Sequence, residues 1–289
     1  MMTSIFQEAR EQRRGPVRAT RHSASVAAAI CASLLLAQAV SSEPVHVRYR
    51  EGVVHGFLAL RTLEGAMLAD GDLIQVDRGD RVTARLVFHF KDGSINDETA
   101  VFSQRDRFRL ISYHLIQKGP AFPQPMDVSI DASSGQTTVR YADKDGRQKV
   151  EQERLDLPDD TSNGIILTLL KNVPPEAPPA SVSLVAATPK PRLVKLAIRT
   201  AGDESFTTGG TSRKATHYVL KVEIGGLSGL LAPLLGKQPP DSHVWIIQGE
   251  APAFVKSEQP LYAGGPLWRI ELVSPVWPRG AEPDGSTGR

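Results

Sequence analysis

Residues 81–91 read RVTARLVFHFK, and their alternation decides the fold class. The odd-numbered positions of this stretch are mostly polar, whereas the even-numbered ones are apolar: Val82, Ala84, Leu86, Phe88 and Phe90. A two-residue period over eleven positions is typical of a strand with one buried face and one face toward solvent. The next four residues, Lys91 to Ser94, include Asp92-Gly93 and predict a turn, because Gly tolerates a positive φ.

Similar short segments lie on both sides of this strand. Residues 45–50 and 53–62 flank Glu51-Gly52 and predict a hairpin. In all we expect about eight strands before residue 158, most of them separated by turn residues such as Asp-Gly and Ser-Gly: 45–50, 53–62, 81–91, 95–104, 108–117, 126–132, 137–143 and 147–157. Consecutive strands with short links pair antiparallel with their neighbours.

One segment breaks the strand pattern. Residues 159–173 read DDTSNGIILTLLKNV, with apolar residues at helical spacing. We predict one short helix over 162–172, capped by the Asp, Thr and Ser residues before it and ended by Pro174-Pro175. Residues 174–180 predict a stiff linker. Because the helix is apolar, Leu169 and Leu170 are expected to face the sheet.

Strand patterns resume after the linker. They cover 181–188, 192–200, 216–224, 243–250, 253–258 and 267–274. The predicted fold class is therefore mainly β, with an antiparallel sheet packed on one short central helix. We favour a single domain over 40–278, although the helix and linker could instead separate two domains. Residues 279–289 combine Gly, Pro and charge and predict a disordered tail.

The amino-terminal stretch predicts an export signal. Residues 1–24 hold five arginines and two acids, 25–40 carry no charge, and Ala37-Gln38-Ala39 is a small-x-small cleavage pattern. The sequence therefore predicts a signal peptide over 1–39 and a periplasmic or secreted protein. An uncleaved membrane anchor and a cytosolic helix are the alternatives, but the sixteen uncharged residues are shorter than the ~20 that span a bilayer.

Charge and cysteine content exclude several classes of function. Removing residues 1–39 leaves 34 − 5 = 29 basic and 32 − 2 = 30 acidic residues, a net charge of −1 that does not favour nucleic acid. The single cysteine, Cys31, lies within the signal. The mature chain thus has no disulfide, thiolate nucleophile or cysteine metal site.

Four segments carry a resemblance to a known family: 90–102 (FKDGSINDETAVF), 154–175 (RLDLPDDTSNGIILTLLKNVPP), 215–224 (ATHYVLKVEI) and 243–256 (HVWIIQGEAPAFVK). Their layout resembles an uncharacterised family of exported bacterial proteins, a domain of unknown function related in fold to the lipoprotein-carrier half-barrels. The resemblance implies a curved sheet, or half-barrel, with a helix packed against it. It implies no catalytic residues.

Two segments come close to a phosphate-binding or catalytic motif, but each lacks a required spacing or residue. Residues 229–237 place six residues between two glycines where a phosphate loop has four, and GGLSGL at 225–230 lacks the last glycine of a nucleophile elbow. Asp97 and Glu98 are adjacent, so in a strand they point to opposite faces, and we expect turn or surface roles for both. The mature chain's six histidines have no metal-ligand spacing, and we expect structural roles for all of them.

Two groups of apolar residues are the candidate sites. We predict an apolar ligand site lined by Phe88, Phe90, Trp245 and Trp268, with core packing as the alternative. The stretch 225–237 is either a buried apolar loop or an exposed lip that contacts lipid or a protein partner. The lip would consist of leucines: Leu227, Leu230, Leu231, Leu234 and Leu235.

These observations favour a non-enzymatic, exported envelope module that binds an apolar molecule or a protein partner in or beside a half-barrel cavity. No cofactor, metal or nucleic acid is expected, and contact with a membrane would involve 225–237. The alternative hypothesis is a structural scaffold without a ligand. An enzyme of unknown reaction is the third hypothesis, because the sequence shows no nucleophile–base pair and no metal-ligand set.

Overall fold

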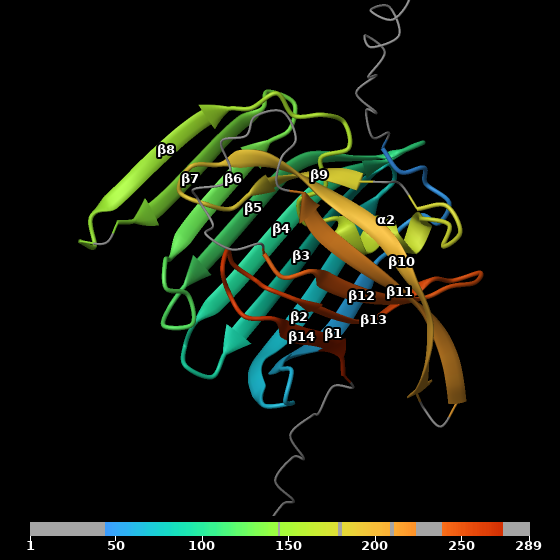
Figure 1. Ribbon diagram of the computed structural model, residues 1–289. Helices are drawn as coiled ribbons and strands as arrows, with labels where there is room; N and C mark the ends of the chain where they lie inside the picture. Colours follow the sequence, from blue (N-terminus) through green and yellow to red (C-terminus); the bar gives the residue numbers. More distant parts are fainter. Residues whose placement is uncertain (1–43, 144, 179–180, 209–210, 224–238, 274–289) are drawn as a thin grey trace, which may run out of the picture. The chain divides into compact units, whose positions relative to one another are not determined.

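The computed structural model describes residues 44–143, 145–178, 181–208, 211–223 and 239–273. The described residues form fourteen strands in a single antiparallel sheet and one short helix, α2 (Ile166–Asn172) (Figure 1). The strands are β1 (Val54–Thr62), β2 (Met67–Arg78), β3 (Arg81–Phe90), β4 (Ile95–Gln104), β5 (Phe108–Lys118), β6 (Met126–Asp131), β7 (Gln136–Ala142), β8 (Gln148–Arg154), β9 (Ser181–Ala186), β10 (Arg192–Thr208), β11 (Thr211–Glu223), β12 (Ser242–Ile247), β13 (Ala253–Gln259) and β14 (Trp268–Leu272).

The sheet consists of two runs of consecutive strands that meet at β1 and β14. Its order is β8-β7-β6-β5-β4-β3-β2-β1-β14-β13-β12-β11-β10-β9, so β8 and β9 are its two terminal strands. At the junction Leu58 lies opposite Leu272, and Leu60 lies opposite Ile270. Figure 1 shows the later run curving across the face of the earlier one. The predicted curved antiparallel sheet with one short helix is thus confirmed, and the sheet is unclosed.

The larger hydrophobic cluster lies between the two runs and the helix. It includes Phe102 of β4, Val128 of β6 and Tyr218 of β11, together with Leu169 and Leu170 of α2. Leu169 is 2% exposed and Leu170 is fully buried. Both leucines therefore pack into the core that the sheet surrounds, as predicted from their helical spacing.

Helix α2 begins later than the sequence predicted. The segment before it extends the β9 edge instead: Ser162 N donates to Ser183 O, and Ser183 N donates to Asp160 O. The Asn163 side chain completes this pairing through both atoms of its amide, which bond the backbone N and O of Val185. The helical turns start only after Gly164, whose φ of 71° a side chain would strain.

The count of eight early strands holds, but two segments were assigned wrongly. Residues 45–50 form no hairpin with β1; instead, Val45 and Val47 bond the backbone at Asp106 and Phe108, beside β5. Strand β2 was missed because its inward positions include Ala69, Gly71 and Gln75, so its alternation is not apolar against polar. One error cancelled the other in the total.

Several sequence predictions lie outside the described residues. They are the signal peptide over 1–39, the tail over 279–289 and the apolar lip over 225–237. The strands and α2 belong to one compact unit. In the part of the chain that the structure describes, no helix has the length and apolar character needed to cross a bilayer.

Candidate functional site

Three of the four aromatic residues predicted to bind a ligand lie together in a second hydrophobic cluster. Phe88 and Phe90 of β3 and Trp268 of β14 are 0%, 8% and 9% exposed. The Phe90 ring centroid lies 5.6 Å from that of Trp268 and 5.4 Å from that of Phe122, a residue that the sequence analysis did not single out. These aromatic side chains pack against one another, and Tyr262 lies on the outside of the cluster.

Trp245 belongs to a different group, which we call the histidine group: His217, His243, Trp245 and Lys256. The Trp245 ring stacks on His217 at 4.3 Å, and Lys256 Nζ lies 4.0 Å from the centre of the Trp245 ring. The structure therefore does not bring all four predicted ligand-site residues together. The leucines of the predicted lip lie outside the described residues.

Within the histidine group, His217 is largely covered and contacts a second histidine. Its Nε2 lies 2.9 Å from Nδ1 of His243, and its side chain is only 14% exposed. Burial lowers the pKa of His217, and Glu204, whose Oε1 lies 3.1 Å from its Nδ1, partly offsets this effect. The pair was missed because the two histidines are distant in sequence and become neighbours through the pairing of β11 with β12.

The inner face of the sheet carries an apolar surface that is not fully covered. We call it the inner patch: Leu73, Leu86, Phe254 and Leu272. Leu73 of β2 lies directly opposite Leu86 of β3. Both contact the second cluster and keep exposed surface, as does Phe254 of β13, which contacts both clusters. Leu272 is 49% exposed.

Two further residues belong to the same row: Gly56 lies between Leu73 and Leu272, and Glu98 lies at one end. At β1, Gly56 lies opposite Leu73, and a Cβ on Gly56 would be 3.6 Å from Leu272. At β4, Glu98 lies opposite Leu86 and keeps some exposed surface. Residues directly opposite in an antiparallel pair share a face and lie about 5 Å apart at Cβ. The inner face thus presents a continuous apolar row that ends at a carboxyl group.

Glu98 accepts a single side-chain hydrogen bond among the described residues, from the Tyr113 hydroxyl at 2.9 Å. Burial raises the pKa of the Glu98 carboxyl, and the Tyr113 hydrogen bond lowers it in part. Burial and the adjacent carboxylate hold the Tyr113 pKa well above its usual value. Asp97, the preceding residue, instead pairs with Arg85 on the outer face. The two acids point to opposite faces as predicted, but the expected surface role of Glu98 is wrong.

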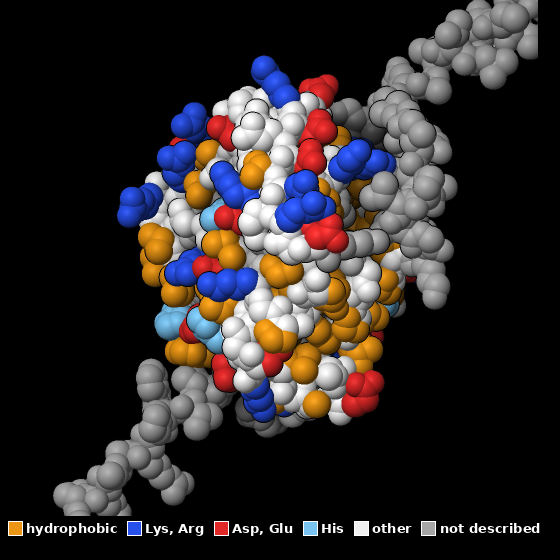
Figure 2. All heavy atoms as spheres, turned by 90° about the vertical axis from the view of Figure 1, so that its left-hand side faces the viewer, with side chains coloured by type: hydrophobic (Ala, Val, Ile, Leu, Met, Phe, Trp, Pro, Cys, Tyr) orange, Lys and Arg blue, Asp and Glu red, His pale blue; other side chains and the backbone are white. Residues whose placement is uncertain are grey.

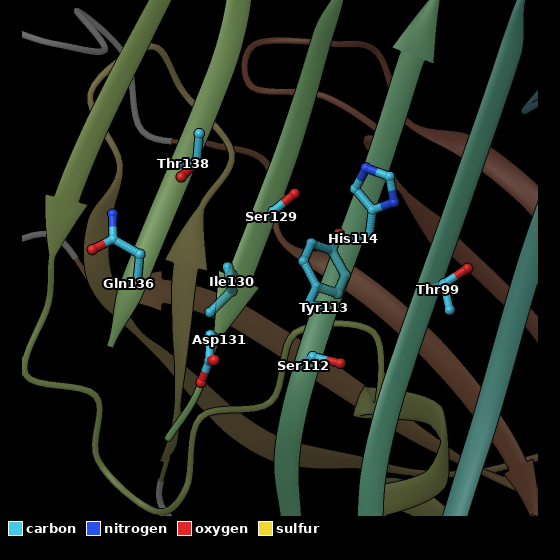
Figure 3. Close-up of a pocket in the computed structure, with 9 residues that line it drawn as sticks. All are labelled: Thr99, Ser112, Tyr113, His114, Ser129, Ile130, Asp131, Gln136 and Thr138. Atoms are coloured by element: carbon cyan, nitrogen blue, oxygen red, sulfur yellow. The ribbon is translucent and has the colours of Figure 1, made fainter. Parts of the chain in front are cut away.

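A groove of about 320 Å³ lies on the outer face of β4 to β7. Thr99, Ser129 and Thr138 lie in one row with His114, each opposite the next on a neighbouring strand (Figure 3). His114 Nε2 lies 3.1 Å from Asp127 Oδ1, and no described hydroxyl group hydrogen-bonds the ring. Figure 2, which views the side of β7 and β8, shows basic and acidic side chains intermixed. The groove offers hydroxyl donors and acceptors to a polar ligand.

A second pocket, of about 440 Å³, lies where residues 48–51 pass α2 and the link between β12 and β13. Asn172 Oδ1 accepts hydrogen bonds from the backbone N of Arg48 and Tyr49, and Lys171 Nζ lies 2.5 Å from Glu51 Oε1. Gln75 Nε2 also donates to Glu51. These contacts hold the segment before β1 against the helix. In the described residues no group of three or more His, Cys, Asp or Glu is placed to hold a metal ion.

The fold defines a mainly β protein with one curved, unclosed antiparallel sheet. No family model matches the sequence, and no curated protein matches it. Among solved structures the chain resembles a beta-barrel-like protein of domain of unknown function DUF1849 from Brucella abortus, with 9% sequence identity and a TM-score of 0.42. The alignment covers 78% of this chain and 98% of that chain. A likeness at this level carries no argument about function.

Proposed function

We propose that the protein is an exported, non-enzymatic envelope module that binds an apolar molecule on the inner patch. The observation that carries the proposal is the partial exposure of Leu73, Leu86 and Phe254 on the face that elsewhere forms the core. Apolar side chains on the inner face of a curved sheet are normally covered by other protein atoms, and a ligand that covers them gains about 25 cal/mol for each Å² of apolar surface removed from water.

The proposed export and envelope location rest on the sequence. The basic stretch, the uncharged stretch and Ala37-Gln38-Ala39 together predict a signal peptide and a periplasmic or secreted protein. Amino-terminal sequencing of the exported protein should begin near Val40. Recovery of an intact first residue in a membrane fraction would contradict export of a soluble form.

Adjacent residues of β2 provide a matched test of binding. Leu73 belongs to the inner patch, whereas Ile74 points to the outer face and is 41% exposed. The uncharged probe N-phenyl-1-naphthylamine, which fluoresces in apolar surroundings, should bind the native protein. Leu73→Lys should weaken this binding by about tenfold or more, since a charge would then occupy the apolar surface, at a cost above about 1.4 kcal/mol. Ile74→Lys should leave it unchanged.

A second variant separates loss of binding from loss of folding. Leu272→Lys changes the most exposed residue of the inner patch, so it should weaken probe binding while the thermal unfolding midpoint stays close to that of the native protein. Equal probe binding by all three variants and the native protein would overturn the proposal.

The packing of the two clusters favours a second candidate, the structural scaffold without a ligand. Leu170 and Phe88 are fully buried, so much of the inner face is already filled by the protein's own side chains. Under this alternative the inner patch binds no apolar probe. The same titration therefore decides between the two functions.

A further inference from the structure

Glu98 is an unusual residue for the end of an apolar row. Its carboxyl lies beyond Leu86 on the inner face, and Leu115 of β5, which is 5% exposed, lies opposite it on the other side. Among the described residues its side-chain hydrogen-bond partner is the Tyr113 hydroxyl, and no basic side chain forms an ion pair with it. An ionised carboxyl group accepts up to about four hydrogen bonds, so most of its capacity is unused.

We propose that the inner patch selects apolar molecules that carry a hydrogen-bond donor at one end, a hydroxyl or an ammonium group, and that Glu98 accepts a hydrogen bond from this donor. This inference rests on the proposed function and names the ligand chemistry of the same site. The apolar part of the ligand would lie along Leu86, Leu73 and Leu272, and the donor would lie beside Glu98.

The charge of Glu98 gives the direction of the selectivity. Transfer of a carboxylate away from water is costly unless donors replace the lost hydration. A ligand hydroxyl or ammonium group supplies such a donor, and hydrogen bonds to charged groups are among the strongest in proteins. A ligand that ends in a carboxylate would instead bring a like charge to a site with little solvent to screen it.

The surroundings of Glu98 agree with this assignment. Of the side chains that face it from neighbouring strands, Leu86 and Leu115 are apolar and Tyr113 supplies a neutral hydroxyl group. Burial raises the pKa of Glu98, and an ammonium group beside it would favour the ionised carboxylate again. Preference for an amine should therefore fade as the pH falls and Glu98 becomes protonated.

Three ligands of equal chain length test the inference. Dodecylamine, dodecanol and dodecanoate would each displace N-phenyl-1-naphthylamine from the native protein near neutral pH, below their aggregation limits. The amine and the alcohol should bind about tenfold more tightly than the carboxylate, a difference of about 1.4 kcal/mol. The comparison of amine with alcohol shows which donor is preferred.

Adjacent acids provide the matched variants. Glu98→Gln removes the inner carboxylate and should bring the affinities for dodecylamine and dodecanoate within about threefold of each other, less than about 0.7 kcal/mol. Asp97→Asn removes one negative charge at the next position but on the outer face, where Asp97 pairs with Arg85. It should leave the tenfold preference intact.

The outcomes distinguish failure of this inference from failure of the proposed function. If the probe binds and all three ligands displace it equally, with no change in Glu98→Gln, the head-group selectivity is overturned and the apolar site stands. If Asp97→Asn also lost the tenfold preference, the head-group selectivity at Glu98 would likewise be overturned. The preference would then come from the overall negative charge and not from a hydrogen bond to Glu98. If the probe does not bind the native protein, both proposals fail.

Discussion

Phe88 and Leu86 lie two residues apart on the same face of β3, yet one is covered and the other is not. Phe88 is fully buried in the second cluster, whereas Leu86 keeps exposed surface in the inner patch. The difference lies in what covers them: Leu58, Phe122 and Trp268 belong to the cluster around Phe88. One strand face thus serves as core at one end and as accessible apolar surface a few ångströms away.

Truncation of the two residues should give the largest contrast. Phe88→Ala removes a fully buried ring and should lower the free energy of unfolding by about 3–5 kcal/mol, because both the transfer energy and the packing are lost. Leu86→Ala removes a partly exposed side chain and should cost about 1–2 kcal/mol. Urea titration measures both. Equal losses would show that Leu86 is also a core residue and would argue against the inner patch.

A methyl group added beside Phe88, or instead within the inner patch, sharpens the comparison. A Cβ on Gly71 would lie 2.4 Å from the Phe88 ring, so Gly71→Ala should destabilise by about 1–3 kcal/mol through overpacking. A Cβ on Gly56 would meet Leu272 at 3.6 Å and Leu73 at 3.8 Å, which is ordinary contact. Gly56→Ala should therefore change stability by less than about 1 kcal/mol. Thermal unfolding of the two variants provides the measurement. If Gly56→Ala were the more destabilising of the two, the inner patch would be packed more tightly than Phe88, contrary to the comparison.

The pH dependence of stability should show the smallest effect. Because the folded state raises the pKa of Glu98, it binds this proton more tightly than the unfolded chain does. At pH values above the pKa that Glu98 has in the folded protein, the ionised carboxyl group therefore lowers the free energy of unfolding. This loss of stability disappears as the pH falls through the ordinary pKa range of a Glu carboxyl. Glu98→Gln should stabilise by on the order of 1 kcal/mol at about pH 7.5 and by little at about pH 4.

Tyr113→Phe is the contrasting variant for this measurement. It removes the hydrogen bond that lowers the pKa of Glu98, so the pKa should rise further and the pH-dependent cost should become larger than in the native protein. Denaturant titrations at both pH values measure it. A Tyr113→Phe protein with the same pH dependence as the native one would show that the hydroxyl does not act on Glu98.

Much of the strand arrangement could be predicted because alternation is a local property. Strand β3 and the six strands after the helix were found where apolar residues recur at every second position. Strand β2 was not predicted because polar residues occur on both of its faces. Asp70 and Asp72 point outward, while Gly71 and Gln75 point inward. The segment 45–50 alternates like a strand, but its partners are Asp106, Phe108 and Asn172.

The candidate site was predicted less well, because its members depend on pairing between distant segments. Phe88, Phe90 and Trp268 were chosen for their size, and the same size makes them core residues once Phe122 and Leu58 surround them. Glu98 could have been noticed as the one acid on the face of β4 that also carries Ala100 and Phe102 at a two-residue period. His217 and His243 gave no signal at all, because only the pairing of β11 with β12 makes them neighbours.

The sequence by itself determined most of the strands and, within each predicted strand, which residues share a face, because a two-residue period follows from backbone geometry alone. It also determined that Leu169 and Leu170 need apolar cover. Only the tertiary structure decided which inward residues receive cover. That outcome depends on how far the second run of strands reaches across the first, and therefore on contacts such as those of Trp268 and Phe254 that no local pattern records.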